Sequence, residues 1–406
     1  MIKKVKTSNL KVGMYIHDLN VPWLEHGFAK NRFLIQDEQQ IAKMVQVNIS
    51  EVLIDTVRGI DEVHSPSMEE AESELMGKMI DVASGSATGS RTGRGDVPLL
   101  ESRKVHFEAV KVVSDILGDV RIGKQVNVEQ ATPVVSNITE AVLQNDGTLV
   151  SLCRIKHRDT YTFQHSVSIS ALLVTFCNSV GGFSGDQLID IGLGGLFHDI
   201  GKMRIPDEIL NKPGRLTEDE FAVMRSHVTE GVNYLNDEKR LSESAIKIVG
   251  EHHERFDGTG YPKGLARKSI SEIGQMTSIV DVYDAITSIR VYHSALEPSD
   301  ALKRIFEWSG KHFEEGMVQR FIKAIGIYPV GSLVRLESDH LAVVLRQGES
   351  NMLTPLVRIV FDAKTGHRLL PKNLDLAAPN CQNQIAGYEI PSKWGIDPIQ
   401  FVGRGL

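Results

Sequence analysis

The sequence predicts a multidomain α+β protein in which a long helical middle is flanked by two small β-rich regions. Its 406 residues exceed the usual size of one domain, so two or three folding units are expected. The composition, 41% apolar and 24% charged, is typical of a globular protein. Apolar residues at helical spacing dominate from about residue 101 to about 327, with short strand-like segments on either side.

Residues 1–64 form the first expected unit, a small mixed α/β domain for which a regulatory role is one option. Segments 14–16 and 52–55 have the composition of strands, and 38–45 that of a helix. From residue 65 the character changes: acidic positions dominate first, and SGSATGSRTGRGD then has almost nothing to bury. Because such compositions remain flexible, we expect a linker over residues 65–100.

The helical middle should contain a connector over residues 101–147 and a helical domain over 148–328. One helix start is clear, because Thr217 followed by Glu220 fits a capping box. A second long helix is predicted from about Ser271, where apolar residues recur on one face.

Residues 329–406 return to short alternating segments, at 332–336, 341–345 and 357–361. We expect them to form a β-rich C-terminal extension.

Charge, cysteine content and hydropathy exclude several classes of protein. The 45 basic and 52 acidic residues leave a net charge of −7, which argues against a DNA or RNA polymer as partner. The three cysteines form no CxxC pair, so neither a disulfide framework nor a structural zinc site is indicated. No apolar run reaches the roughly 20 residues of a membrane span, and we expect a cytoplasmic protein.

Histidines and aspartates gather in the helical middle. One such histidine by itself is more often an ordinary core or surface residue, but imidazoles and carboxylates together are the ligand set of iron, manganese and zinc. His198 and Asp199 lie at a helix end, where neighbouring side chains can serve two ions through a shared carboxylate. The candidate ligands are His165, His198, Asp199, His227, His252, His253 and Asp281.

Two motifs carry a family resemblance. The segments HDIGK (198–202) and HHERFDGTGYP (252–262) resemble, in order and spacing, the two signatures of the HD-GYP domain over about residues 148–328. The first ~60 residues also resemble an N-terminal domain of unknown function that often precedes HD-GYP domains. The resemblance implies a helical HD-type fold and metal-dependent hydrolysis of a cyclic dinucleotide, a bacterial signalling molecule. The product would be the linear dinucleotide, and a second cleavage would give mononucleotides.

The resemblance also implies the ligand sets. Members with a third metal place a glutamate four residues before the first histidine; here that position is Tyr161, so two ions, iron or manganese, are expected. One ion would be held by His165, His198, Asp199 and Asp281, and the other by Asp199, His227, His252 and His253.

Substrate contacts carried over from the family are less complete. Lys202 and Asp199 are the expected catalytic residues, with Lys202 stabilising charge on the phosphate or leaving group. Gly260 and Tyr261 would lie in a loop beside the site, and Arg290 would contact phosphate or base. The family continues with proline, an aromatic residue and a cation, whereas this chain has Val291, Tyr292 and His293. The substrate, cyclic di-GMP or cyclic GMP-AMP, therefore stays open.

Two alternative functions remain at this level, and the role of the N-terminal domain is open. One is an HD-type phosphohydrolase of simple nucleotides, although these lack the GYP segment. Another is a catalytically silent sensor or scaffold that binds a dinucleotide or a protein. The N-terminal domain could also mediate a homodimer or bind a protein partner.

Overall fold

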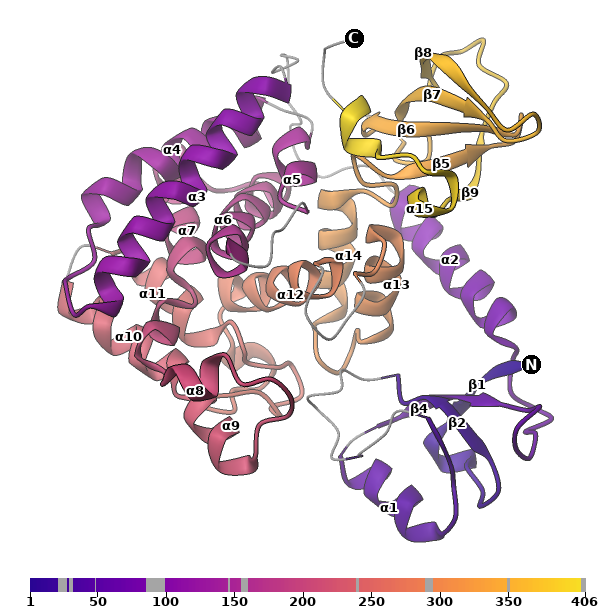
Figure 1. The fold of residues 1–406 in the computed structure, drawn as a ribbon, viewed down its shortest axis with the longest axis horizontal. Coiled ribbons are helices and arrows are strands. Elements are labelled where there is room, and N and C mark those ends of the chain that lie inside the picture. Colours follow the sequence, from indigo (N-terminus) through magenta and orange to yellow (C-terminus); the bar gives the residue numbers. More distant parts are fainter. Residues whose placement is uncertain are drawn as a thin grey trace. The chain divides into compact units, whose positions relative to one another are not determined.

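The computed structural model describes residues 1–20, 28, 32–47, 49–84, 99–144, 147–154, 160–238, 241–288, 295–348 and 351–402. The chain divides into two compact units, Met1–Lys78 and Met79–Leu406 (Figure 1). The long helical region and two small sheets confirm the predicted multidomain α+β class.

The first unit is built on a four-stranded antiparallel sheet with order β1-β4-β2-β3. Val52 and Ile54 are buried, while their neighbours along the strand are half-buried, which is the period-two pattern of a one-sided sheet. Asp37 caps α1 by accepting from the backbone N–H of Gln40. The strands predicted at 14–16 and 52–55 and the helix predicted at 38–45 are confirmed as β2 (Tyr15–Asp18), β4 (Glu51–Asp55) and α1 (Glu38–Gln46). The unit also contains β1 (Ile2–Lys6), the 3-10 helix η1 (Thr7–Asn9) and β3 (Phe33–Leu34), which were not predicted.

The linker predicted over residues 65–100 is wrong in part, because α2 (Met68–Ser84) is a helix. The backbone N–H of Ser67 donates to the Glu70 carboxylate, and the Glu70 N–H donates back to the Ser67 hydroxyl. Acidic residues suggested a solvated segment, but in the first turn of a helix they complement its dipole. Residues 85–98, which hold most of the glycine- and serine-rich segment, lie outside the described residues.

The second unit is mainly helical, and its core extends over more of the chain than predicted. Ala109, Val113 and Ile138, on α3 and α4, are buried in the same core as Val167 and Leu196. The segment expected as a connector, 101–147, is therefore part of the helical domain because its apolar face packs there (Figure 1). The elements are α3 (Leu99–Arg121), α4 (Val128–Gln144), α5 (Thr148–Leu152), α6 (Tyr161–Val180), α7 (Gly185–Phe197), η4 (Ile200–Arg204), α8 (Asp207–Leu210), α9 (Glu218–Arg225), α10 (His227–Glu238), α11 (Glu243–Glu251), η5 (Arg267–Ser269), α12 (Glu272–Thr287), α13 (Pro298–Glu307) and α14 (Glu315–Ile325).

Local capping places the helix starts near the site where the sequence predicted them. Thr217 and Glu220 form a reciprocal capping box at the start of α9. The Ser271 hydroxyl accepts from the backbone N–H of Gly274 at the start of α12. Both predicted starts are confirmed.

The C-terminal extension is β-rich, as predicted. Its five-stranded antiparallel sheet has the order β8-β7-β6-β5-β9. It is attached to the helices by the Tyr388 hydroxyl, which donates to the Ile327 carbonyl, and by packing of Tyr388 on Tyr328, with ring centroids 5.0 Å apart. The elements are β5 (Leu333–Leu336), β6 (His340–Arg346), β7 (Leu356–Asp362), β8 (His367–Asp375), β9 (Ile385–Tyr388), α15 (Pro391–Trp394) and η6 (Pro398–Phe401).

Within the described residues, no helix combines the length and the apolar character that crossing a bilayer requires.

Candidate metal centre

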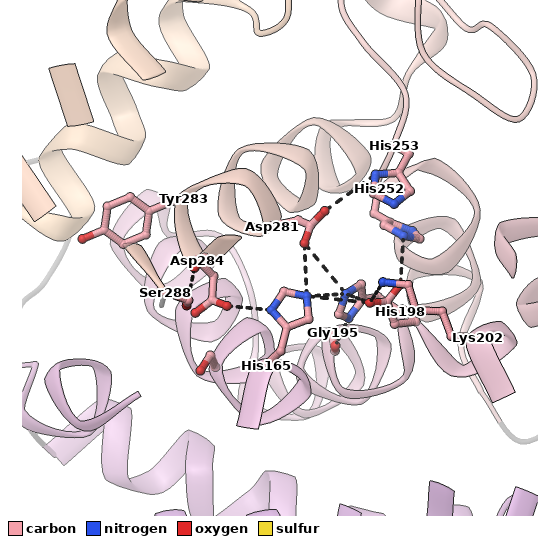
Figure 2. A network of polar contacts seen from close by, with 12 residues as sticks. His165, Gly195, His198, Lys202, His252, His253, Asp281, Tyr283, Asp284 and Ser288 are labelled. Carbon is pink, nitrogen blue, oxygen red and sulfur yellow. Dashed lines mark hydrogen bonds and ion pairs between the residues drawn. The ribbon is translucent and has the colours of Figure 1, made fainter. Parts of the chain in front are cut away.

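The predicted ligands come together from five helical segments that are far apart in the sequence. Figure 2 shows His165, His198, His252, His253 and Asp281 among them. His198 and His252 are the C-cap residues of α7 and α11, and His227 is the first residue of α10, two positions after the end of α9. Asp199 and His253 follow the two C-cap histidines, and His165 and Asp281 lie inside α6 and α12. These side chains are buried, except that His253 is 25% exposed.

Helix ends orient three of the imidazole rings. The Nδ1–H groups of His198, His227 and His252 donate to backbone carbonyls three residues earlier, over 2.8, 2.7 and 2.8 Å. Carbonyls in the last turn of a helix lack intrahelical donors, so they are free to accept these bonds. Each ring is thereby turned so that Nε2 points to the centre.

His165 needs another acceptor, because carbonyls in a helix interior are already used. Its Nδ1–H donates over 2.6 Å to Oδ2 of Asp284, a buried residue on α12 (Figure 2). The sequence analysis missed Asp284. The available signal was its spacing of three residues from Asp281, which places both carboxylates on one helix face.

The two oxygens of Asp199 face different histidine pairs. Oδ2 is 3.2 Å from His198 Nε2 and 3.7 Å from His165 Nε2. Oδ1 is 3.3 Å from His227 Nε2 and 3.7 Å from His252 Nε2. Oδ1 is buried and accepts no hydrogen bond from any described residue. A buried, unsatisfied carboxylate oxygen of this kind is suited to a cation.

The imidazole lone pairs also indicate a cation site. Because each Nδ1 donates, each Nε2 carries a lone pair when its ring is neutral. The Nε2 atoms of His165 and His198 are 3.2 Å apart, and those of His227 and His252 are 3.4 Å apart. Facing lone pairs repel unless positive charge lies beside them. The residues therefore fit a metal centre, in two groups that share Asp199.

Asp281 is close to both groups. Its Oδ1 is 3.2 Å from His165 Nε2, as expected from the predicted first ligand set. Its Oδ2 turns the other way and lies 3.7 Å from His253 Nδ1, a contact that the sequence analysis did not anticipate (Figure 2).

The surroundings of most of these side chains favour the protonation states of metal ligands, which are ionised carboxylates and neutral imidazoles. Burial opposes ionisation of Asp199, but the Lys202 ammonium and the His198 imidazole outweigh it and hold the pKa well below the usual range. Asp281 also has a strongly lowered pKa, because neighbouring imidazoles overcome its burial. Burial lowers the pKa of His252, and that of His253 further. His198 is the exception: burial disfavours its cation, but Asp199 raises its pKa.

The predicted substrate residues are placed in part. The Lys202 ammonium donates to Asp199 Oδ2, so this lysine contacts the ligand set directly. The Tyr261 ring lies 4.6 Å from the His253 ring. Position 260, next to Tyr261, requires glycine. A Cβ there would lie only 2.4 Å from the backbone nitrogen of Arg255, which is too close. The other two predicted contacts, Arg290 and His293, lie outside the described residues.

The chain is similar to known proteins over its whole length. Residues 154–316 match an HD domain model, and residues 2–131 match a domain of unknown function, DUF3391. The chain is 36% identical over 408 residues to a cyclic di-GMP phosphodiesterase of Pseudomonas aeruginosa, covering 100% of this chain and 96% of the relative. It is 40% identical over 127 residues to a 3'3'-cGAMP-specific phosphodiesterase of Vibrio cholerae, covering 31% of this chain and 24% of the relative.

Comparison with solved structures gives a distant match. It is an HDG"Y"P protein from Bdellovibrio bacteriovorus, at 18% identity and a TM-score of 0.46, covering 79% of this chain and 98% of that one. The family assignment depends instead on sequence similarity along the full length of the chain. The chain belongs to the HD-GYP family of metal-dependent cyclic-dinucleotide phosphodiesterases.

Proposed function

We propose that the protein hydrolyses cyclic di-GMP to the linear dinucleotide with two divalent cations, iron or manganese. The observation that carries the proposal is the Asp199 carboxylate, whose two oxygens face two separate histidine pairs. One cation would be held by His165, His198, Asp199 and Asp281, and the other by Asp199, His227, His252 and His253.

The donor set supports this number and kind of metal. Imidazole and carboxylate without thiolate suit iron and manganese. Tyr161 stacks on His165, with ring centroids 5.9 Å apart, at the position where a third-metal glutamate would lie. A phenol there adds no carboxylate, which favours two ions. When bound, such ions activate water near neutral pH and neutralise phosphodiester oxygens.

The chain's own residues orient the substrate and balance its charge. Lys202, already in contact with the ligand set, would stabilise negative charge on the phosphate or on the leaving 3′ oxygen. Water oxygen adds to phosphorus, and the bond from phosphorus to the 3′ oxygen breaks. Gly260 and Tyr261 would form one wall of the binding site. We assign contacts with phosphate or base to Arg290 and His293 as well.

The choice of substrate follows the relative that matches the whole chain, which acts on cyclic di-GMP by name. A second candidate is 3'3'-cyclic GMP-AMP, because His293 stands where the family pattern has a fixed cation.

The test uses full-length protein supplied with iron or manganese under reducing conditions. The two cyclic dinucleotides are offered separately, and products are separated by chromatography. We expect cleavage of cyclic di-GMP to be the faster and to be lost in the double variant His198→Ala, Asp199→Ala. His367→Ala, an exposed histidine at the start of β8, is the matched control and should keep full activity. A metal-loaded protein that cleaves neither substrate would instead support a binding module.

A further inference from the structure

Two aromatic rings, those of Tyr261 and Phe221, lie next to each other beside the candidate metal centre. Tyr261 lies beside His253, and the Phe221 ring is 6.4 Å from the Tyr261 ring at an angle of 78°. Phe221 is four residues before Arg225 on the same helix, so both lie on one face. We call Phe221 and Tyr261 the aromatic platform.

The platform carries one arginine. The guanidinium carbon of Arg225 is 5.1 Å from the Phe221 ring centroid and 6.0 Å from that of Tyr261. A cation over ring faces is held in place without being neutralised.

Arg225 has no carboxylate partner among the described residues, whereas the neighbouring lysines do. Lys202 is paired with Asp199, and Lys212 lies 2.6 Å from Glu220. Across the part of the chain that the structure describes, Arg225 forms no ion pair. Its side chain is exposed, and it precedes His227 by two residues. A solvent-accessible, unpaired guanidinium is therefore present next to a candidate ligand.

We infer that Arg225 is a substrate-binding residue that contacts the second, uncleaved phosphodiester of the cyclic dinucleotide. This inference rests on the proposed function. A cyclic dinucleotide has two phosphodiesters, and only one is at the metal centre when it is cleaved. The other needs a cation from the protein, which carries a net charge of −7 and so offers little general attraction. The planar guanidinium can donate two hydrogen bonds to a phosphodiester.

The test separates binding at Arg225 from chemistry at the metal centre. In metal-loaded, full-length Arg225→Gln, we expect the KM for cyclic di-GMP to rise about ten- to a hundredfold, the effect of losing one charged hydrogen bond, while kcat stays nearly unchanged. Arg225→Lys should restore part of the lost affinity, because lysine keeps the positive charge but lacks the planar pair of N–H donors. Arg58→Gln is the matched control, since Arg58 is an exposed arginine over Tyr15 at 4.2 Å in the first unit.

Two further substrates make the result specific. Bis(p-nitrophenyl) phosphate has a single phosphodiester, so Arg225→Gln should cleave it like the wild type. Cyclic GMP-AMP has the same second phosphodiester as cyclic di-GMP, so its KM should rise by a similar factor.

Each contrary result has one meaning. An unchanged KM in a variant that unfolds at the wild-type temperature would overturn the inference and leave the proposed function intact. A rise in KM for cyclic di-GMP alone would overturn the inference, because Arg225 would then recognise guanine and not the second phosphodiester. An equal loss of activity on bis(p-nitrophenyl) phosphate would also overturn the inference, because it would show that the substitution damages the metal centre. If the wild type cleaves no cyclic dinucleotide, the proposed function and this inference fail together.

Discussion

At the scale of single residues, the centre depends on which nitrogen of each histidine is committed elsewhere. Three rings donate Nδ1–H to carbonyls at helix ends, and His165 donates to the Asp284 carboxylate. All four rings therefore direct Nε2 toward the same small volume. A charged acceptor also forms a stronger hydrogen bond with its ring than a carbonyl does, so His165 should be the ligand most dependent on its support.

Replacing Asp284 by asparagine tests this dependence. The amide oxygen can still accept from Nδ1, but the negative charge is lost, and we expect metal affinity to fall about ten- to a hundredfold. Competition with a chromophoric chelator measures the affinity. Asp300→Asn, an exposed residue paired with Lys303 on α13, is the control. Wild-type affinity in Asp284→Asn would mean that the bond orients the ring without supporting the metal.

At the scale of elements, the loop after α11 is held by a buried carboxylate. Glu254 accepts from the backbone N–H groups of Lys263 and Leu265, over 2.8 and 2.9 Å, with one oxygen each. The Tyr261 N–H donates to the His253 carbonyl over 3.1 Å. The loop that carries Tyr261 is thus tied back to the segment that carries two candidate ligands.

Glu254→Gln should loosen this loop. An amide has one acceptor oxygen, so one of the two N–H groups is left without its partner, at a cost of about 1–3 kcal/mol. We expect faster amide hydrogen exchange in peptides covering residues 257–266, together with a lower free energy of unfolding. Glu315→Gln, an exposed first-turn residue of α14, should change neither. Unchanged exchange in 257–266 would show that other contacts hold the loop.

At the scale of the whole molecule, the centre belongs to one unit. All seven predicted ligands lie between residues 165 and 281, inside Met79–Leu406. The C-terminal sheet is joined to the same unit, and Arg154 connects it to α13 by donating to the Gly331 carbonyl and pairing with Glu297. Metal binding should therefore stabilise the helices and the sheet together, and not the first unit.

Thermal unfolding with and without manganese tests that expectation. Metal that binds the native state stabilises it by about 2.7 kcal/mol at a hundred times Kd, which raises the unfolding temperature by roughly 4 °C for a unit as large as Met79–Leu406. Chelation should reverse the shift. Hydrogen exchange should become slower in the second unit and stay constant in peptides of residues 1–67. Protection that spreads into the first unit would contradict the confinement of the centre.

The sequence by itself determined the features that depend on local interactions or on residue chemistry. The capping residues Thr217 and Ser271 and the alternating strand 52–55 are confirmed, because caps and periodicity act within a few residues. The seven proposed ligands lie close together, and few functions require so many histidines and aspartates within one helical region. Their role as metal ligands stays a prediction.

Tertiary structure alone decided the rest. It placed Asp284 against His165, 119 positions away, and it turned Asp281 toward both ligand groups. It also placed Arg225 over Tyr261 and packed segment 101–147 into the helical core. The physical reason is the same in each case: a side chain's partner across the fold is chosen by how helices pack, and packing depends on every apolar face at once rather than on any local pattern.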